Sequence, residues 1–302
     1  MNKQQIRESL SGVFAPVSTP FTESGEVNYE GLKQNMAKYA ASKLKGFLAL
    51  GSNGENKSLT MDEKFKVLEI IVKHKGAHQT VMTGCIAEST METIFIARKA
   101  QEIGTDFITL LPPNYFKAQM TDAVLATFFS EVADVVGKPC LLYNAPQFSG
   151  GVVLSTSLVK QLSGHRNIVG VKDSSNAASI DNYLLSCPGE FAILAGSANY
   201  MVSAMLNGAL GGIVSLANAF PDECWKLWNL VATKQYEDGF AYNKKLLRVS
   251  RSVSGKGGVS AVKAAMDIAG LVGGYPRRPL LPLAQQAKDE LRAALKAEGL
   301  LK

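Results

Sequence analysis

A single lysine, Lys172, stands at the end of an apolar, β-branched run at residues 168–171. The run is typical of a short buried strand. An ammonium group at the end of such a strand is costly, whereas a neutral amine is a nucleophile that forms an imine with a carbonyl compound. A lysine there can also simply mark the point where a strand reaches water. The rest of the sequence has to decide between these two interpretations.

Four further polar side chains occur where apolar runs end: Ser52, Asn53, Tyr115 and Tyr143. Ser52 and Asn53 lie between glycines, in a segment whose backbone N–H groups and side chains could bind a carboxylate. The same composition also suits an ordinary turn. Tyr143 is a candidate proton shuttle, although a buried tyrosine more often serves as a core aromatic with a satisfied hydroxyl. Tyr115 follows two prolines and could equally contribute to loop packing.

The elements that must position these side chains alternate along the chain. Eight strands are expected at residues 13–18, 46–50, 80–85, 106–111, 140–144, 168–172, 192–195 and 212–215. Helices are expected at residues 29–42, 61–75, 90–103, 122–136, 155–162, 177–185, 200–206 and 222–233. Several follow a capping residue, such as Thr60 or Thr121. Eight such pairs predict an α/β fold of the (β/α)8 TIM-barrel type, because an open doubly wound sheet has no requirement for eight units.

In a barrel, the carboxyl ends of all the strands lie on the same face. Its active face is formed by the carboxyl ends of the strands and the loops that follow them. Lys172, Tyr143 and the residues after the second strand should therefore meet on one face. The expected substrate-binding residues on that face are Ser52, Asn53, Ser174, Gly196 and Ile213.

The pattern changes after the eighth helix. Residues 1–233 are expected to form the barrel, and residues 234–302 a helical extension packed on it as one structural unit. Its helices are predicted at residues 234–253, 259–271 and 283–300. The Gly-rich segment 254–258 lacks the spacing of a phosphate-binding loop and follows no strand, so we interpret it as a hinge or turn.

Composition narrows the class of protein. The 302 residues are 46% hydrophobic and 19% charged, enough for one barrel-sized domain or two smaller ones. The net charge of +6 is not gathered in a basic run, so it argues against nucleic acid as a partner and gives weak support for a small anionic substrate. Four scattered cysteines without a Cys-x-x-Cys pair suggest buried thiols in the cytoplasm. No apolar run has the length of a membrane span.

Other catalytic chemistries lack their residues. The three histidines, His74, His78 and His165, do not lie at predicted strand ends, which disfavours a zinc site. A Gly-x-Ser-x-Gly elbow and a dinucleotide fingerprint are absent from the sequence. The remaining hypothesis is covalent lysine catalysis with no metal and no cofactor.

The motifs, taken in order, resemble those of one family. Gly-Ser-Asn-Gly-Glu at 51–55, Tyr-Asn-Ala-Pro at 143–146 and Gly-Val-Lys-Asp-Ser at 170–174 match its carboxylate loop, its tyrosine motif and its Schiff-base lysine segment. Tyr115 falls where the family has a tyrosine that reaches into a neighbouring subunit. The chain thus resembles the dihydrodipicolinate synthase and N-acetylneuraminate lyase family of class I, pyruvate-dependent aldolases over nearly its whole length.

That resemblance implies roles for the candidate residues. Lys172 would form the imine, and Tyr143 would move protons with Ser52 and Tyr115 as its relay. It also implies a reversible cleavage, in which a 4-hydroxy-2-oxo acid or a 2-keto-3-deoxy sugar acid gives pyruvate or a glyoxylate-type product plus an aldehyde. The expected assembly is a homotetramer, a dimer of dimers, that needs no cofactor.

One departure bears on the substrate. Dihydrodipicolinate synthases carry an arginine shortly after the tyrosine motif, and Phe148 stands at that position here. An apolar ring cannot make the bidentate contact with a carboxylate that arginine makes. The motifs are more similar to those of 4-hydroxy-2-oxoglutarate aldolase. Dihydrodipicolinate synthesis and a non-catalytic 2-oxo-acid sensor remain the alternatives.

Overall fold

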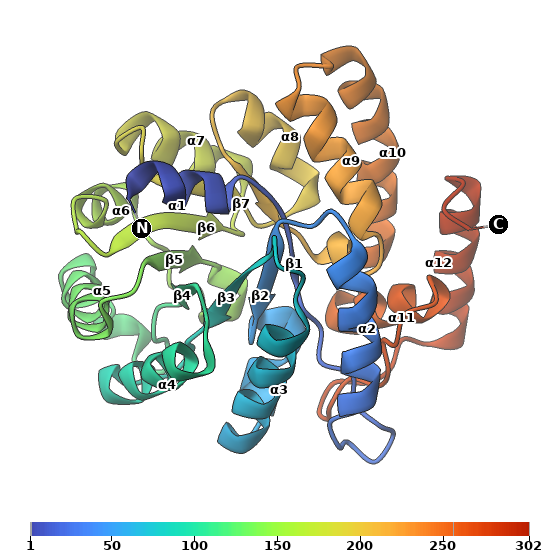
Figure 1. The fold of residues 1–302 in the computed structure, drawn as a ribbon, viewed down its shortest axis with the longest axis horizontal. Helices are drawn as coiled ribbons and strands as arrows, with labels where there is room; N and C mark the ends of the chain where they lie inside the picture. The colour runs from blue at the N-terminus through green and yellow to red at the C-terminus, as the bar shows by residue number, and fades with distance from the viewer. Residues whose placement is uncertain (1, 256, 302) are drawn as a thin grey trace.

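The computed structural model describes residues 2–255 and 257–301, and its strands form a closed parallel barrel (Figure 1). Each strand pairs with the next, and β1 pairs with β8 to close the ring. The strands are β1 (Gly12–Pro16), β2 (Gly46–Ala49), β3 (Thr80–Gly84), β4 (Phe107–Leu110), β5 (Cys140–Asn144), β6 (Ile168–Asp173), β7 (Ala192–Ala195) and β8 (Gly211–Ile213). The predicted TIM barrel is confirmed.

The barrel helices lie where the sequence patterns placed them, within one or two residues. They are α2 (Tyr29–Ala41), α3 (Met61–His74), α4 (Thr90–Ile103), α5 (Asp122–Val136), α6 (Thr156–Leu162), α7 (Ala177–Ser186), α8 (Ala198–Leu206) and α9 (Pro221–Ala232). The two named caps are confirmed. The side chain of Thr60 accepts a hydrogen bond from the Glu63 N–H, and that of Thr121 accepts one from the Val124 N–H.

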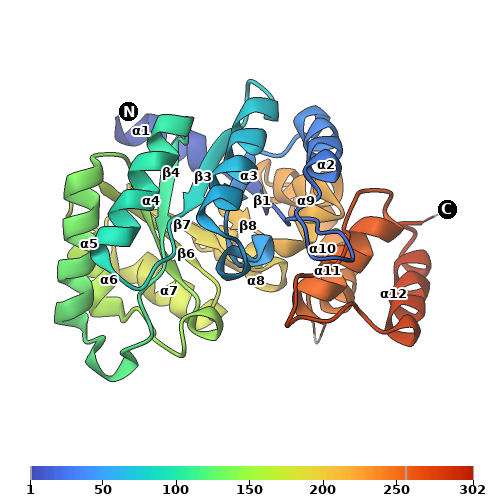
Figure 2. The ribbon, with the colours of Figure 1, turned by 90° about the horizontal axis from the view of Figure 1, so that it is seen from below.

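The sequence patterns missed one helix, α1 (Lys3–Leu10). Figures 1 and 2 show it lying across one end of the barrel. Its two buried residues, Ile6 and Leu10, join the inward-facing side chains of the strands, such as Phe14 and Phe107. Two apolar residues four positions apart make too short a pattern to predict a helix. The helix is stable because it closes the barrel, which only the tertiary structure supplies.

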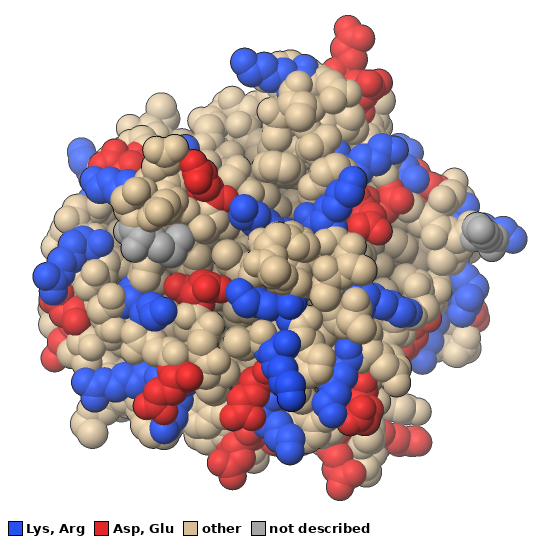
Figure 3. Space-filling view, in the orientation of Figure 1, with Lys and Arg blue, Asp and Glu red and all other residues tan. Residues whose placement is uncertain are grey.

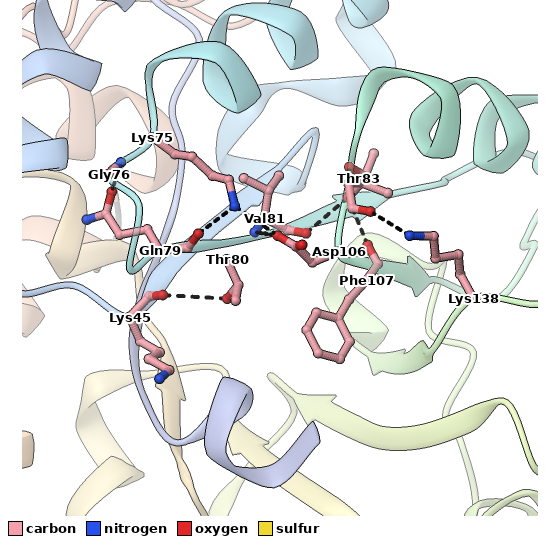
Figure 4. A network of polar contacts seen from close by, with 11 residues as sticks. Lys45, Lys75, Gly76, Gln79, Thr80, Val81, Thr83, Asp106, Phe107 and Lys138 are labelled. Carbon is pink, nitrogen blue, oxygen red and sulfur yellow. Dashed lines mark hydrogen bonds and ion pairs between the residues drawn. The ribbon is translucent and has the colours of Figure 1, made fainter. Parts of the chain in front are cut away.

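A polar network links the amino ends of the strands, away from the site (Figure 4). Asp106 Oδ2 accepts hydrogen bonds from Lys75 Nζ at 3.3 Å and from the Val81 N–H at 2.8 Å. Lys75 Nζ also donates to the Gln79 carbonyl at 2.7 Å. The loop before β3 therefore has partners for its polar groups, which fixes the start of the strand.

Three helices follow the barrel: α10 (Tyr236–Ser254), α11 (Gly258–Ile268) and α12 (Gln285–Ala297). All three were expected, although the last is shorter than its pattern indicated. Val262, Ala265 and Met266 of α11 join the main hydrophobic core, and Figures 1 and 2 show α12 beyond α11 at the outer edge. The Gly-rich segment separates α10 from α11, as a turn would; Lys256 within it lies outside the described residues.

Surface and thiol properties agree with the composition. On the face shown in Figure 3, basic and acidic side chains are interspersed rather than gathered into a stripe. Cys85, Cys140 and Cys224 are buried, Cys187 is half-buried, and all four are free thiols. Among the described residues, no helix is long and apolar enough to cross a membrane.

Candidate active site

Lys172 and Tyr143 lie side by side at the carboxyl ends of two paired strands. Tyr143 of β5 is the register partner of Lys172 of β6, whose other neighbour is Leu194 of β7. Only 3% of Lys172 is exposed, and its Nζ lies 4.1 Å from the centroid of the Tyr143 ring. The strand register thus places an amine and a phenol together, with little of either side chain exposed.

The segment 51–55, here called the Ser52 loop, follows β2 and brings two more candidates to this site. Ser52 Oγ lies 3.4 Å from the Tyr143 hydroxyl, at the long end of hydrogen-bond distance. Asn53 Nδ2 donates a hydrogen bond to Ser215 Oγ at 3.0 Å, which connects the loop to the 3₁₀ helix that follows β8. The structure therefore brings Ser52, Asn53 and Tyr143 together, as expected from the sequence.

Unusual backbone conformations flank the Ser52 loop. Leu50, just before it, and Glu55, its last residue, have φ angles of 54° and 53°. The left-handed region costs a residue other than glycine roughly 1–2 kcal/mol. Such strain persists only where surrounding contacts enforce it, and it is concentrated at functional sites. One such contact is the hydrogen bond from Asn56 Nδ2 to the Leu50 carbonyl, at 2.8 Å.

A cavity of about 360 Å³ opens over Lys172, which is large enough for a small substrate. Six of the predicted residues line it: Asn53, Tyr143, Lys172, Ser174, Gly196 and Ile213. Ser52 lines an adjoining cavity of about 470 Å³, and Phe148 borders both. Among the described lining residues of the first cavity, Lys172 is the one Lys, Arg, Asp or Glu, so the remaining wall offers neutral hydrogen-bonding and apolar groups.

Gly196 makes room for Ser174. A Cβ atom at position 196 would lie 1.9 Å from Ser174 Oγ and 2.7 Å from the Asp173 carbonyl oxygen. The Gly196 N–H donates a hydrogen bond to the Asp173 carbonyl at 2.6 Å, and this bond holds the ends of β6 and β7 together. The absence of a side chain at Gly196 therefore allows Ser174, two residues after the lysine, to line the cavity.

Tyr115 lies apart from these residues within a single chain. It is 80% exposed and packs edge-to-face against Phe116, with ring centroids 5.1 Å apart. The Glu88 carboxylate accepts hydrogen bonds from the Asn114 and Tyr115 N–H groups, at 2.8 and 3.0 Å. Tyr115 thus lies exposed on a loop held by Glu88, and it lines neither of the two cavities.

Several lining residues escaped the sequence reasoning. Ser215 binds Asn53, and the Tyr200 hydroxyl, whose pKa is raised by burial, donates to the Asp173 carbonyl at 3.1 Å. The helical extension contributes too, through Ser254, Gly258, Val259 and Val262. Serines at strand ends were the available signal for Ser215. No local signal could have brought α10 and α11 to the cavity, because they lie far along the chain from the other lining residues.

No cluster of three or more His, Cys, Asp and Glu side chains suited to a metal ion occurs in the part of the chain that the structure describes. What the site does hold is an amine beside a phenol, at the carboxyl ends of barrel strands. This is the arrangement of a class I aldolase, a lysine-dependent carbon–carbon lyase.

The chain belongs to the dihydrodipicolinate synthetase family, whose model matches residues 9–298. A probable mitochondrial 4-hydroxy-2-oxoglutarate aldolase of Emericella nidulans is 30% identical over 95% of this chain and 94% of its own. An L-threo-3-deoxy-hexylosonate aldolase of Hypocrea jecorina is 28% identical over 96% and 98%. A chloride-inhibited dihydrodipicolinate synthase of Acinetobacter baumannii, solved with pyruvate, has a TM-score of 0.91 at 27% identity, covering 97% and 100%. The expected family and enzyme class are confirmed.

Proposed function

We propose that this protein is a Schiff-base-forming aldolase that cleaves a 4-hydroxy-2-oxo acid or a 2-keto-3-deoxy sugar acid. The observation that carries the proposal is the cluster of Lys172, Tyr143 and Ser52 at one end of the barrel, with Lys172 and Tyr143 lining one cavity. The same lysine would serve the reverse reaction, because each step of imine catalysis is reversible.

In the first step, the Lys172 amine attacks the C2 ketone, and loss of water gives a protonated imine. Tyr143 passes its own proton to the relay through Ser52 and, as the phenolate, accepts the proton of the C4 hydroxyl while the C3–C4 bond breaks. The aldehyde leaves, and the electron pair of the broken bond passes to C3 and the imine as an enamine. Tyr143 returns the proton to C3, and water then hydrolyses the pyruvate imine to free the lysine. With 4-hydroxy-2-oxoglutarate as the substrate, the aldehyde that leaves is glyoxylate.

The hydrogen-bonding and apolar groups around the cavity suggest how each part of the substrate would bind. The Ser52 loop, with the Ser52 and Asn53 side chains, would hold the α-carboxylate. Ser174 would donate a hydrogen bond to the distal part of the substrate, and Gly196 and Ile213 would shape the wall opposite. We infer a small 2-oxo acid as the partner of this site.

We further propose that the active form is a homotetramer, a dimer of dimers, in the cytoplasm. The exposed ring of Tyr115 supports this, since Tyr115 lines neither cavity of its own chain and would complete the relay from Ser52 to Tyr143 in a second copy. The four free thiols are in keeping with a reducing compartment.

Phe148 bears on the choice between cleavage and dihydrodipicolinate synthesis. It borders the cavity with 47% of its surface exposed and offers no charge for a second carboxylate. This disfavours the synthase, and among the proposed aldolase substrates it favours a 2-keto-3-deoxy sugar acid, whose distal end carries no carboxylate.

The test is to incubate the protein with pyruvate and sodium borohydride and to locate the adduct by mass spectrometry. The reduced imine is expected on Lys172. A Lys172→Ala variant should lose the adduct, whereas a matched Lys3→Ala variant, altered at an exposed lysine of α1, should keep it. Absence of added mass at Lys172 in the unaltered protein would refute the mechanism. A coupled assay with 4-hydroxy-2-oxoglutarate, 2-keto-3-deoxygluconate, N-acetylneuraminate, and pyruvate plus aspartate semialdehyde then identifies the reaction.

A further inference from the structure

A buried pair of charges lies beside the site but outside the proposed chemistry. Lys263 of α11 and Glu55 of the Ser52 loop meet at 2.5 Å, with 1% and 2% of their side chains exposed. Removing two charges from water is expensive, and apolar residues of similar size often stabilise a fold as well or better. A pair kept at this position therefore calls for a role other than stability alone.

The Lys263 ammonium is held by two carbonyls as well as by Glu55. Besides its ion pair with the Glu55 carboxylate, it donates hydrogen bonds to the carbonyls of Thr19 at 2.7 Å and Tyr275 at 2.6 Å. It also lies 4.5 Å from the centroid of the Phe21 ring. Burial lowers the pKa of this ammonium to about 8, while the Glu55 carboxylate acts in the opposite direction.

Both oxygens of the Glu55 carboxylate are held by the C-terminal part of the chain. One pairs with Lys263, and the other accepts the Arg277 N–H at 2.9 Å. The backbone of Glu55 is in the left-handed region, and its N–H donates to the Ser52 carbonyl at 3.1 Å. Glu55 therefore lies in the same short turn as Ser52, and the contacts of its carboxylate hold the strained backbone of that turn in place.

Lys263 reaches the Ser52 loop by a second route. The Thr19 carbonyl accepts one of its protons, and Thr19 Oγ1 donates to the Gly54 carbonyl at 2.8 Å. One ammonium group therefore supports the loop directly through Glu55 and indirectly through Gly54. Both routes consist of contacts within the chain, so they support the loop before a substrate binds.

We propose that Lys263 and Glu55 are positioning residues, through which the helical extension holds the Ser52 loop in the geometry that binds the substrate carboxylate. The inference rests on the proposed function, in which that loop binds the α-carboxylate. If so, the helical extension contributes to substrate affinity through the Ser52 loop, in addition to its own residues that line the cavity. Loss of either charge would let the loop relax from its strained backbone, so that Ser52 and Asn53 no longer meet the carboxylate together.

The experiment measures the pyruvate concentration that gives half-maximal borohydride trapping at Lys172. Variants Glu55→Gln and Lys263→Met each remove one charge, and the double variant leaves no unpaired buried charge. Each is expected to raise the half-saturating pyruvate concentration about tenfold or more, while trapping at saturating pyruvate stays within roughly threefold of the unaltered protein. Arg248→Gln, which breaks the exposed Arg248–Glu298 pair of the same extension, is the matched control and should change neither value.

Unchanged half-saturation in the folded variants, with a lower melting temperature, would overturn the proposal and leave the pair a stabilising contact. If the charge variants do not fold, Thr19→Val tests the second route, because it removes only the hydroxyl that binds the Gly54 carbonyl. It should raise half-saturation about threefold, and no rise would count against the proposal. An unaltered protein that forms no adduct refutes the proposed function, and the positioning role with it. An adduct without any shift in the variants refutes the positioning role alone.

Discussion

Gly196→Ala should damage the site through a single methyl group. The new Cβ would lie 1.9 Å from Ser174 Oγ and 2.7 Å from both the Asp173 carbonyl oxygen and Ser174 Cα, whereas Cβ contacts below 3.0 Å are essentially never seen. The serine hydroxyl can rotate away from the methyl group. The two backbone atoms cannot, so the ends of β6 and β7 must separate.

The consequences follow from what this junction holds. Overpacking of this kind costs about 1–3 kcal/mol of unfolding free energy. The shift displaces Ser174 and the strand that carries Lys172, and small misplacements of reacting groups reduce rates by up to about a hundredfold. We therefore expect kcat/KM for aldol cleavage to fall roughly tenfold to a hundredfold, together with a lower melting temperature.

The assay compares steady-state cleavage and thermal unfolding of Gly196→Ala with those of Gly189→Ala. No atom lies within 4 Å of a Cβ at Gly189, so that substitution should change neither quantity. Adding Gly196→Ala to Ser174→Ala should cost less than it does in the unaltered protein, because one of the clashes has been removed. Wild-type kcat/KM and melting temperature in Gly196→Ala would show that the close approach has no influence on the site.

Three further outcomes are expected. Tyr143→Phe keeps the ring beside Lys172 but removes the hydroxyl, so kcat for cleavage should fall by about 10²–10⁴ while borohydride still traps pyruvate on the lysine; equal loss of trapping would assign Tyr143 to imine formation instead. Phe148→Arg adds a bidentate carboxylate donor at the cavity, and KM for 4-hydroxy-2-oxoglutarate should fall about tenfold with KM for 2-keto-3-deoxygluconate unchanged; equal changes for both substrates would show that the site does not distinguish them by charge. The hydrogen bonds of Arg277 lower the pKa of Glu63 from 4.5 to about 2, so their contribution is complete above pH 4.5 and is lost as the pH falls towards 2. The unfolding free energy of Glu63→Gln, measured by denaturant unfolding, should therefore be about 1–2 kcal/mol lower than that of the unaltered protein at pH 7. This difference should shrink as the pH falls below 4.5, and a difference independent of pH would refute the linkage.

The helices and strands of the barrel could be predicted because their signals are local. Short apolar runs mark the strands, a period of 3.6 residues marks the helices, and caps such as Thr60 mark where helices begin, each within a few residues of the chain. The eighth strand is the partial exception. It ends at Ile213, and Ser215 begins a short 3₁₀ helix instead of extending the strand. The sequence does not show where pairing with β7 and β1 stops.

Much of the candidate site could also be predicted, since barrel closure turns strand order into spatial proximity. Once eight parallel strands form a ring, their carboxyl ends must share one face. Lys172, Tyr143 and Asn53, which end or follow three different strands, therefore line one cavity. The cross-subunit place of Tyr115 stays a prediction.

The sequence by itself thus determined the architecture and the candidate reacting groups. Only the tertiary structure showed the contacts that hold these groups in place. Helix α1 closes one end of the barrel, Gly196 leaves space for Ser174, and Lys263 pairs with Glu55 of the Ser52 loop. The reason is physical. Periodicity reports how a residue relates to its neighbours along the chain, whereas a buried ion pair or a close approach depends on atoms that only folding brings within a few ångströms.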